Sequence, residues 1–178
     1  MEFNAGSFRL RKPGYEDADG FIEICSETET MKYYGIAGAC IDTVQKAKDQ
    51  IDWCNNLFEN SGGRWIIVEQ DVNKYIGDIG FHNYQGDHNK VEIGYRIKQK
   101  YWGTGIMTQC IKTLIKYGFE NMNYNRIEAL VDNRNIGSKK VLLKNNFKCE
   151  GTLRDYEFEH GHYIDMDIFS ILRREHNS

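Results

Sequence analysis

Residues 91–119 read VEIGYRIKQKYWGTGIMTQCIKTLIKYGF, and the rest of the chain is best interpreted outward from this stretch. Through residues 91–98 apolar and polar side chains alternate, which predicts a strand with two different faces. From Ile106 onward the apolar residues recur at helical spacing instead. A turn containing two glycines, residues 101–105, lies between the two patterns, and Thr104 is available as the helix N-cap. We therefore expect a strand, a tight turn and a helix.

A turn of this kind has a chemical use. The first backbone N–H groups of a helix lack internal partners and carry partial positive charge, and glycine lets a ligand approach the main chain closely. Phosphate groups bind well at such positions. The dinucleotide fingerprint is absent, because it would need glycine at Thr108, and the P-loop is absent, because it would need lysine at Ile106. The turn alone leaves open whether it binds a ligand or only reverses the chain.

The same stretch resembles the acetyl-CoA pyrophosphate loop of the GNAT N-acetyltransferases, and specifically the RimJ/RimL branch, which acetylates ribosomal-protein N-termini. The family loop, Q/R-x-x-G-x-G/A, falls on residues 102–107. Only Gly105 matches strictly, since Trp102 replaces Gln or Arg and Met107 replaces a small residue. The resemblance implies that Met107 points away from the diphosphate. It also implies that acetyl-CoA is held by the main chain of Trp102, Gly103, Thr104, Gly105, Ile106 and Met107.

Composition bounds the remaining possibilities. A chain of 178 residues with 40% hydrophobic and 28% charged residues is expected to form one soluble domain over residues 1–178. A net charge of −3 gives no general attraction to nucleic acid or to an anionic membrane. No apolar run approaches the ~20 residues of a membrane span, and the first residues do not resemble a signal peptide. Five scattered cysteines without a CxxC pair predict reduced thiols, a cytoplasmic location and no metal site.

Periodicity along the chain predicts the fold class. We expect strands at residues 8–12, 64–70, 75–84, 91–98, 126–132, 147–159 and 163–172, and helices at residues 16–27, 43–60, 106–119 and 135–144. Their order predicts an α/β (α+β) fold with a mixed, mostly antiparallel seven-stranded sheet and helices on both faces. The order also matches the acyl-CoA N-acyltransferase fold of the GNAT family, which implies an acetyl-CoA-binding core at about residues 91–147. Residues 30–40 are irregular, and Tyr33 and Tyr34 there fit either a substrate rim or the core beneath a loop.

A second family pattern, N-x-x-S/A followed by K-x-G-F, falls on residues 135–147. Asn146 occupies the glycine position, where a helix ends in the left-handed region and asparagine is the next best residue. The resemblance implies that Asn135 contacts the pantetheine arm, although a helix N-cap would also explain this asparagine. Many family members donate a proton to the leaving thiolate from a tyrosine at the position held here by Leu142. In the RimL type Ser138 takes that role, as an acid or by orienting a water.

Residues 151–158 resemble the RimL-type segment that supplies the general base, and the matching residue is Glu157. In a regular strand Glu157 would share a face with Asp155. A second candidate is Glu92 on the central strand, where other GNAT branches place a base. Glu92 shares its predicted face with Arg96, so a structural ion pair between these two is the alternative.

The chemistry implied is direct attack of a neutral amine on the thioester. A peptide α-amine has a pKa near 7.7–8.0, so roughly one molecule in ten is already neutral at pH 7 and a modest base is enough. A main-chain N–H of Ile97 or Lys98, where the central strand parts from its neighbour, would stabilise the oxyanion. None of the cysteines lies in a motif for a covalent intermediate.

The resemblance therefore implies an acetyl-CoA-dependent N-acetyltransferase acting on a primary amine. The leading acceptor is a protein N-terminal α-amine of the ribosomal-protein type. The alternatives are a small amine (a polyamine, amino sugar or antibiotic), which acids Glu27, Glu29 and Asp42 near the irregular segment leave open, and a non-catalytic acyl-CoA-binding regulator. We expect a monomer or homodimer that binds no nucleic acid, membrane or metal.

Overall fold

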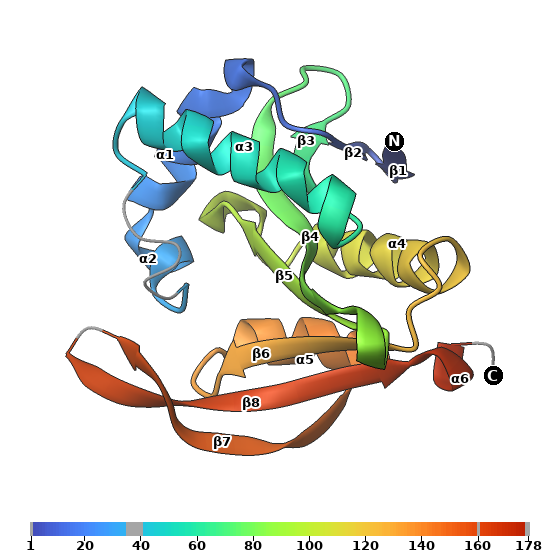
Figure 1. Cartoon of the computed structure of the whole chain (residues 1–178). Coiled ribbons are helices and arrows are strands. Elements are labelled where there is room, and N and C mark those ends of the chain that lie inside the picture. The colour runs from blue at the N-terminus through green and yellow to red at the C-terminus, as the bar shows by residue number, and fades with distance from the viewer. Residues whose placement is uncertain (1, 35–40, 160, 177–178) are drawn as a thin grey trace.

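Figure 1 shows the computed structural model of the chain, in which residues 2–34, 41–159 and 161–176 are described. The strands are β1 (Phe3–Ala5), β2 (Phe8–Arg11), β3 (Arg64–Glu69), β4 (Tyr75–Gln85), β5 (Lys90–Ile97), β6 (Arg126–Asp132), β7 (Lys148–Glu159) and β8 (His162–Leu172). The α-helices are α1 (Ala18–Ser26), α2 (Thr28–Met31), α3 (Val44–Asn60), α4 (Ile106–Glu120), α5 (Ile136–Lys144) and α6 (Arg173–His176). Short 3-10 turns are η1 (Tyr15–Asp17), η3 (Gly86–His88) and η4 (Gln99–Tyr101).

The described strands form one mixed sheet with the order β1-β2-β3-β4-β5-β6-β8-β7. Only β5 and β6 run parallel, and the other neighbours are antiparallel. The predicted mixed, mostly antiparallel sheet is confirmed, but it has eight strands rather than seven. The additional strand is β1, where Phe3 lies opposite Leu10; three residues are too few to show an alternating pattern in the sequence.

Helices cover both faces of the sheet, as predicted, and each face has its own core (Figure 1). Strand β3 shows why, because it is apolar on both sides. Trp65 and Ile67 pack into the core beneath α4 and α5, whereas Ile66 and Val68 pack into the core beneath α1 and α3. Successive side chains of a strand point to opposite faces, so a continuous apolar run serves two layers.

The parallel pair β5–β6 is short, and this shapes the middle of the molecule. Its register covers only three residue pairs, from Lys90 opposite Arg126 to Glu92 opposite Glu128. Beyond Glu92, β5 stays paired with β4 as far as Ile97, while β6 stays paired with β8 to its end. The two halves of the sheet therefore separate toward the carboxyl ends of β5 and β6 (Figure 1).

Strand β7 is not regular. Its register against β8 shifts between Leu153 and Glu157, and Asp155 between them has a φ of 50°. Left-handed backbone inside a strand marks a bulge that leaves extra residues unpaired. Asp155 is exposed and its N–H donates to an Asp165 carboxylate oxygen at 2.9 Å. The prediction that Glu157 and Asp155 share a face assumed unbroken alternation, and the bulge removes that basis.

Two further segments differ from the sequence-based expectation. The predicted helix 16–27 is divided into η1 and α1. The start of the segment predicted to be irregular is partly helical, since α2 runs to Met31 and a turn follows through Tyr34. The remainder of that segment, residues 35–40, lies outside the described residues.

Candidate active site

The glycine turn after β5 has the predicted shape, but a different residue begins the helix. Gly103 and Gly105 have φ values of 73° and 85°, and Gly105 is the N-cap of α4. The Thr104 hydroxyl instead donates to the carbonyl of Tyr101 at 2.7 Å, so the prediction that Thr104 caps the helix is wrong. A Cβ added at either glycine would meet no atom within 4 Å, so the space beside the turn is open.

The residues that depart from the family loop have structural roles that leave this space open. The Trp102 indole Nε1 donates to the Ile97 carbonyl at 2.9 Å, which ties the turn to the end of β5. Met107 is only 7% exposed and belongs to the core, so its side chain points away, as the resemblance implied. Ile106 is buried in the same core. The helix α4 therefore begins beside open space, and the first N–H groups of a helix are a position where anions bind well.

The two candidate main-chain donors on β5 are not equivalent. The Lys98 N–H donates to the Ile76 carbonyl at 2.8 Å, which commits it to β4. That assignment corrects the prediction of Lys98 as a free donor. In an antiparallel ladder, successive residues direct their backbone groups to opposite sides. The Ile97 N–H is therefore directed toward the side where β6 has separated. The Lys98 ammonium is also committed, to Glu23 at 2.5 Å.

A cavity of about 110 Å³ lies where β5 and β6 separate. Tyr33 and Tyr34 line it together with Gly94 of β5, so these two tyrosines lie at a rim. Asn135 and Ser138 line the same cavity from the start of α5. Residues from four separate segments of the sequence thus meet at one opening in the sheet.

Asn135 has the capping role that its residue type predicted, and it also faces the cavity. Its side-chain oxygen accepts the Ser138 N–H at 3.0 Å, which starts α5. The Ser138 hydroxyl lies 2.7 Å from the phenolic oxygen of Tyr95, a residue of β5. Leu142, at the position where many family members carry a tyrosine, is fully buried in the core. Asn146 has a φ of 63°, which confirms the left-handed helix end.

The two candidate bases differ in their electrostatic surroundings. Glu157 is half-buried, and burial followed by the nearby Glu159 carboxylate raises its pKa. Glu92 contacts His82 at 3.5 Å, and the hydrogen bond from His82 lowers the pKa of Glu92. The predicted ion pair between Glu92 and Arg96 is wrong. Between these two carboxylates, Glu157 is the better proton acceptor at neutral pH, since a higher pKa makes a stronger base.

This geometry matches a known family. A family model for the acetyltransferase (GNAT) domain matches residues 7–148. The chain belongs to the GNAT acetyltransferases. Over 168 residues it is 38% identical to the N-acetyltransferase p20 of Bacillus licheniformis, which covers 94% of this chain and 93% of that protein. It is also 31% identical to the ribosomal-protein-serine acetyltransferase of Escherichia coli, over 61% of this chain and 59% of that protein.

Solved GNAT structures have the same fold. A GNAT acetyltransferase from Bacillus anthracis superposes with a TM-score of 0.82 at 26% identity, covering 98% of this chain and 100% of the other. RimL, an acetyltransferase of ribosomal L7/L12 solved with coenzyme A, superposes with a TM-score of 0.86. Its identity is 17%, with 97% of this chain and 98% of RimL covered, so this likeness concerns the fold alone. The predicted GNAT fold is confirmed.

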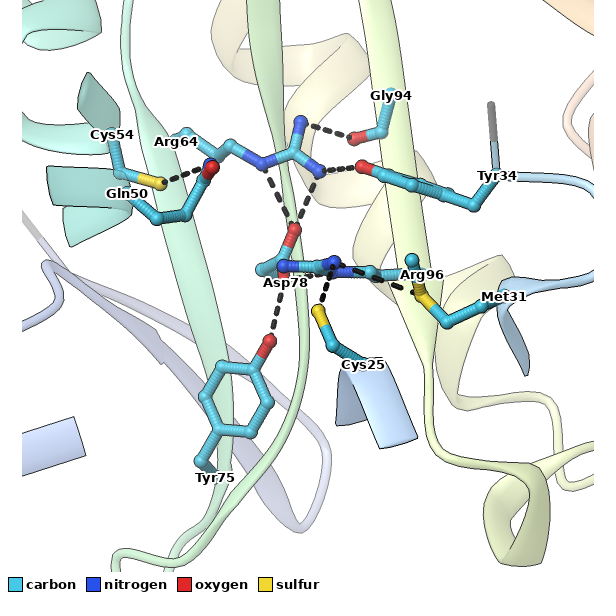
Figure 2. Close-up of polar contacts among 10 residues, drawn as sticks. All are labelled: Cys25, Met31, Tyr34, Gln50, Cys54, Arg64, Tyr75, Asp78, Gly94 and Arg96. Carbon is cyan, nitrogen blue, oxygen red and sulfur yellow. Dashed lines mark hydrogen bonds and ion pairs between the residues drawn. The ribbon is translucent and has the colours of Figure 1, made fainter. Parts of the chain in front are cut away.

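Sequence reasoning missed the most deeply buried polar group of this acetyltransferase, a cluster centred on Asp78 (Figure 2). Asp78 is fully buried and accepts from Arg64 at 2.5 Å, from Arg96 at 2.7 Å and from the Tyr75 hydroxyl at 2.5 Å. The available signal was a lone carboxylate inside the otherwise apolar first part of β4, residues 75–81. Tyr34 accepts from Arg64 at 2.6 Å, so the cluster also fixes part of the cavity wall.

Two further features concern the described part of the chain. It contains no group of three or more histidine, cysteine, aspartate or glutamate side chains arranged to hold a metal ion. None of its helices combines the length and the apolar character needed to cross a membrane.

Proposed function

We propose that this GNAT enzyme transfers the acetyl group of acetyl-CoA to a protein N-terminal α-amine of the ribosomal-protein type. The observation that carries the proposal is the separation of β5 from β6 beside an open glycine turn. A thioester needs both features, a cradle for its diphosphate and a gap in the sheet for its reactive end. The glycine turn follows directly after β5, the strand that borders the gap, and this arrangement supports the proposal.

The residues would divide the work as follows. The main chain from Trp102 to Met107 would hold the diphosphate of acetyl-CoA, and Asn135 would contact the pantetheine arm. The N–H of Ile97 would donate to the thioester oxygen as negative charge develops there. Glu157 would accept the proton of the attacking amine, directly or through a water. Ser138 would supply a proton to the leaving thiolate. Glu92 stays the second candidate for the base.

The choice of an N-terminal α-amine rests on two supports. The first is the likeness to the ribosomal-protein-serine acetyltransferase of Escherichia coli. The second is chemical: an α-amine loses its proton near neutral pH, so a single glutamate of raised pKa is a sufficient base. The described cysteines, Cys25, Cys54, Cys110 and Cys149, are free thiols, which fits the cytoplasm, where such acceptors are made.

A thiol-release screen tests the proposal. Acetyl-CoA would be incubated with peptides that differ in their first residue, with a polyamine, with an amino sugar and with an aminoglycoside. We expect turnover with at least one unblocked peptide and none with its N-terminally blocked form. Faster turnover of a small amine than of every peptide would transfer the function to a small-molecule acetyltransferase. Binding of acetyl-CoA without thiol release from any amine would favour the non-catalytic regulator.

A further inference from the structure

A second, larger cavity adjoins the opening between β5 and β6. Its volume is about 580 Å³, and Tyr33 lines both cavities. An acceptor that approaches the gap between β5 and β6 from the side of α2 would pass along the larger cavity. The described residues that line it are Thr28, Met31, Lys32, Tyr33, Arg134 and His162. Two of these carry a full positive charge at neutral pH, one is a histidine, and none is acidic.

Lys32 is the basic residue available to a ligand. It is exposed, and its ammonium lies 5.5 Å from the centre of the Tyr33 ring. Arg134 lies near the same ring, at 6.0 Å, but Asp132 holds its guanidinium through contacts of 2.9 and 2.6 Å. No carboxylate forms a salt bridge with Lys32 within the described ranges 2–34, 41–159 and 161–176.

The buried cluster behind both cavities adds positive charge. Two guanidinium groups, Arg64 and Arg96, share the single carboxylate of Asp78, which leaves a net charge of one positive unit (Figure 2). Of the partners that the arginines contact beyond Asp78, Tyr34, Gly94 and Met31 are neutral and line a cavity. Arg64 donates to the Tyr34 hydroxyl and to the Gly94 carbonyl. In a low-dielectric interior this excess charge extends its field into the adjoining space.

The same cluster reaches the larger cavity through a sulfur atom. Arg96 contacts the sulfur of Met31 at 3.9 Å, and Met31 lines that cavity. The neighbouring sulfur, Cys25 at 3.3 Å, is also part of this neutral shell. No second carboxylate is paired with either arginine among the residues that the structure describes.

Two of the three acids expected to attract a cationic acceptor, Glu27 and Asp42, are engaged elsewhere, whereas Glu29 is exposed on α2. The Glu27 carboxylate accepts from the Gln99 N–H at 2.8 Å and from the Thr30 hydroxyl at 2.6 Å. Asp42 pairs with Lys46 on the surface at the start of α3. Acidic groups near the chemistry are Glu157 and the buried Glu159 on β7, together with Glu92 and with Asp132, which holds Arg134. The site thus has acidic groups on β7, while the larger cavity is lined by Lys32, directly after α2.

We propose that the acceptor carries a negatively charged group, a carboxylate or a phosphate, close to its reactive amine. The amine would lie toward Glu157 and the anionic group toward Lys32. This inference rests on the proposed function and narrows its substrate class. Two sources share the chemistry: a peptide with acidic residues directly after its first residue, and a small amino-acid-like molecule. Polyamines are excluded as preferred acceptors, since they would place a second cation against Lys32.

The test compares acceptors matched in everything but charge. Three amidated peptides share a first serine and carry aspartate, asparagine or lysine at the next two positions; serine, serinamide and spermidine form the small-molecule arm. Each acceptor is assayed for kcat/KM with the unmodified enzyme, Lys32→Glu and Lys32→Gln. Lys112→Glu, at an exposed lysine of α4 that lines neither cavity, is the matched control.

We expect the aspartate peptide to be preferred over the asparagine peptide, or serine over serinamide, by about threefold to fivefold, since Lys32 is exposed and an ion pair at an exposed site is weak. Lys32→Glu should remove that preference, Lys32→Gln should reduce it, and Lys112→Glu should retain it. Which arm shows the larger preference identifies the source. Equal rates for the three peptides together with equal rates for serine and serinamide would overturn the inference, as would a preference that survives Lys32→Glu.

Calorimetry separates this inference from the proposed function. The aspartate and asparagine peptides, serine and serinamide are titrated into the protein saturated with coenzyme A. Tighter binding of an acidic probe that Lys32→Glu abolishes supports the inference even where no thiol is released. Turnover without any charge preference leaves the function in place and overturns the inference. If neither turnover nor charge-dependent binding is observed, the inference and the proposed function are both overturned.

Discussion

The phenolic oxygen of Tyr95 lies 2.7 Å from the hydroxyl oxygen of Ser138. This contact joins β5 to the first turn of α5 across the opening where β5 and β6 have separated. Burial raises the pKa of Tyr95, so its phenol keeps its proton at neutral pH. A serine hydroxyl alone is a weak acid, but here it is hydrogen-bonded to a protonated phenol. We propose that this pair supplies the proton to the leaving thiolate, since the family's usual tyrosine position holds Leu142.

Replacing Tyr95 with phenylalanine tests this pair. Tyr95→Phe removes the hydrogen bond but retains the ring, so we expect kcat to fall at least about tenfold, within the range of general acid catalysis. The KM for acetyl-CoA should change by less than about twofold, because the loss falls on the chemical step. Steady-state kinetics measure both values.

Two further variants make the Tyr95 prediction specific. Combining Tyr95→Phe with Ser138→Ala should cost little more than the worse single change, because residues that act as a unit are not additive. Tyr84→Phe, which removes a surface tyrosine hydroxyl bound to Asn89, should leave kcat unchanged. A kcat that Tyr95→Phe does not alter would contradict the role assigned to the pair.

Glu157→Gln should lower kcat by about a hundredfold or more, since a positioned general base contributes that much. Its affinity for acetyl-CoA should stay within about twofold, because no contact with the cosubstrate is assigned to this side chain. Glu92→Gln is the matched variant and should reduce kcat far less. Unchanged turnover in Glu157→Gln would transfer the role of base to Glu92 or to water.

The pH dependence of kcat provides a second test of Glu157 as the general base. Burial raises its pKa above the ordinary glutamate value of 4.5. A base must be deprotonated to act, so kcat should fall as pH decreases through this raised pKa. This decrease of kcat at acidic pH should disappear in Glu157→Gln but persist in Glu92→Gln. An identical acidic limb in all three proteins would show that another group titrates there.

Gly105 should be required for cosubstrate binding for two separable reasons. Its φ of 85° strains most L-residues by about 1–2 kcal/mol, and an added side chain would occupy the open space beside the turn. Gly105→Ala should therefore lower stability and weaken acetyl-CoA binding. Gly105→Asn should retain more stability, because asparagine tolerates this region, yet still weaken binding at least about tenfold by obstructing phosphate contacts.

Calorimetric titration with coenzyme A and thermal unfolding measure the two Gly105 effects. Gly86→Ala is the control. The φ of Gly86 is not left-handed, and an added Cβ there would make only ordinary contact, at 3.7 Å. Normal coenzyme A affinity in Gly105→Asn would show that the diphosphate does not lie against this turn.

Asp78→Asn should be among the most destabilising single changes in the protein. Breaking a buried ion pair costs about 3–5 kcal/mol of unfolding free energy, and here two buried guanidinium groups lose their shared carboxylate. Asp42→Asn, which breaks an exposed pair with Lys46, should cost at most ~1 kcal/mol. Urea unfolding followed by circular dichroism measures both, and similar losses for the two would contradict the prediction.

Acid unfolding checks the same cluster. Burial alone would raise the pKa of Asp78, but Arg96 and Arg64 outweigh it and lower the pKa from 3.8 to about 2. A depressed carboxyl pKa stabilises the fold fully above pH 3.8, and that contribution is lost as pH falls toward about 2. Asp78→Asn should show a smaller loss of stability than the unmodified protein across this interval.

The sequence by itself determined the strand, the turn and the helix from residue 91 to residue 120, because alternation and helical spacing are local patterns. It also located the left-handed helix end at Asn146, since few residue types tolerate that backbone, but it did not identify Gly105 as the N-cap of the helix. The family resemblance assigned catalytic roles to Ser138 and Glu157, and these roles stay predictions. Local patterns could not predict which distant residue each side chain contacts.

Tertiary structure decided those partners. Tyr95 and Ser138 are 43 residues apart, and Arg64 and Asp78 are 14 apart, so their contacts depend on which strands are neighbours and in what register. The same holds for Glu92, whose partner proved to be His82 across the β4–β5 ladder. The opening itself exists because β6 remains paired with β8 while β5 remains paired with β4. Hydrogen bonding between distant segments set that divergence, and no spacing within either strand encodes it.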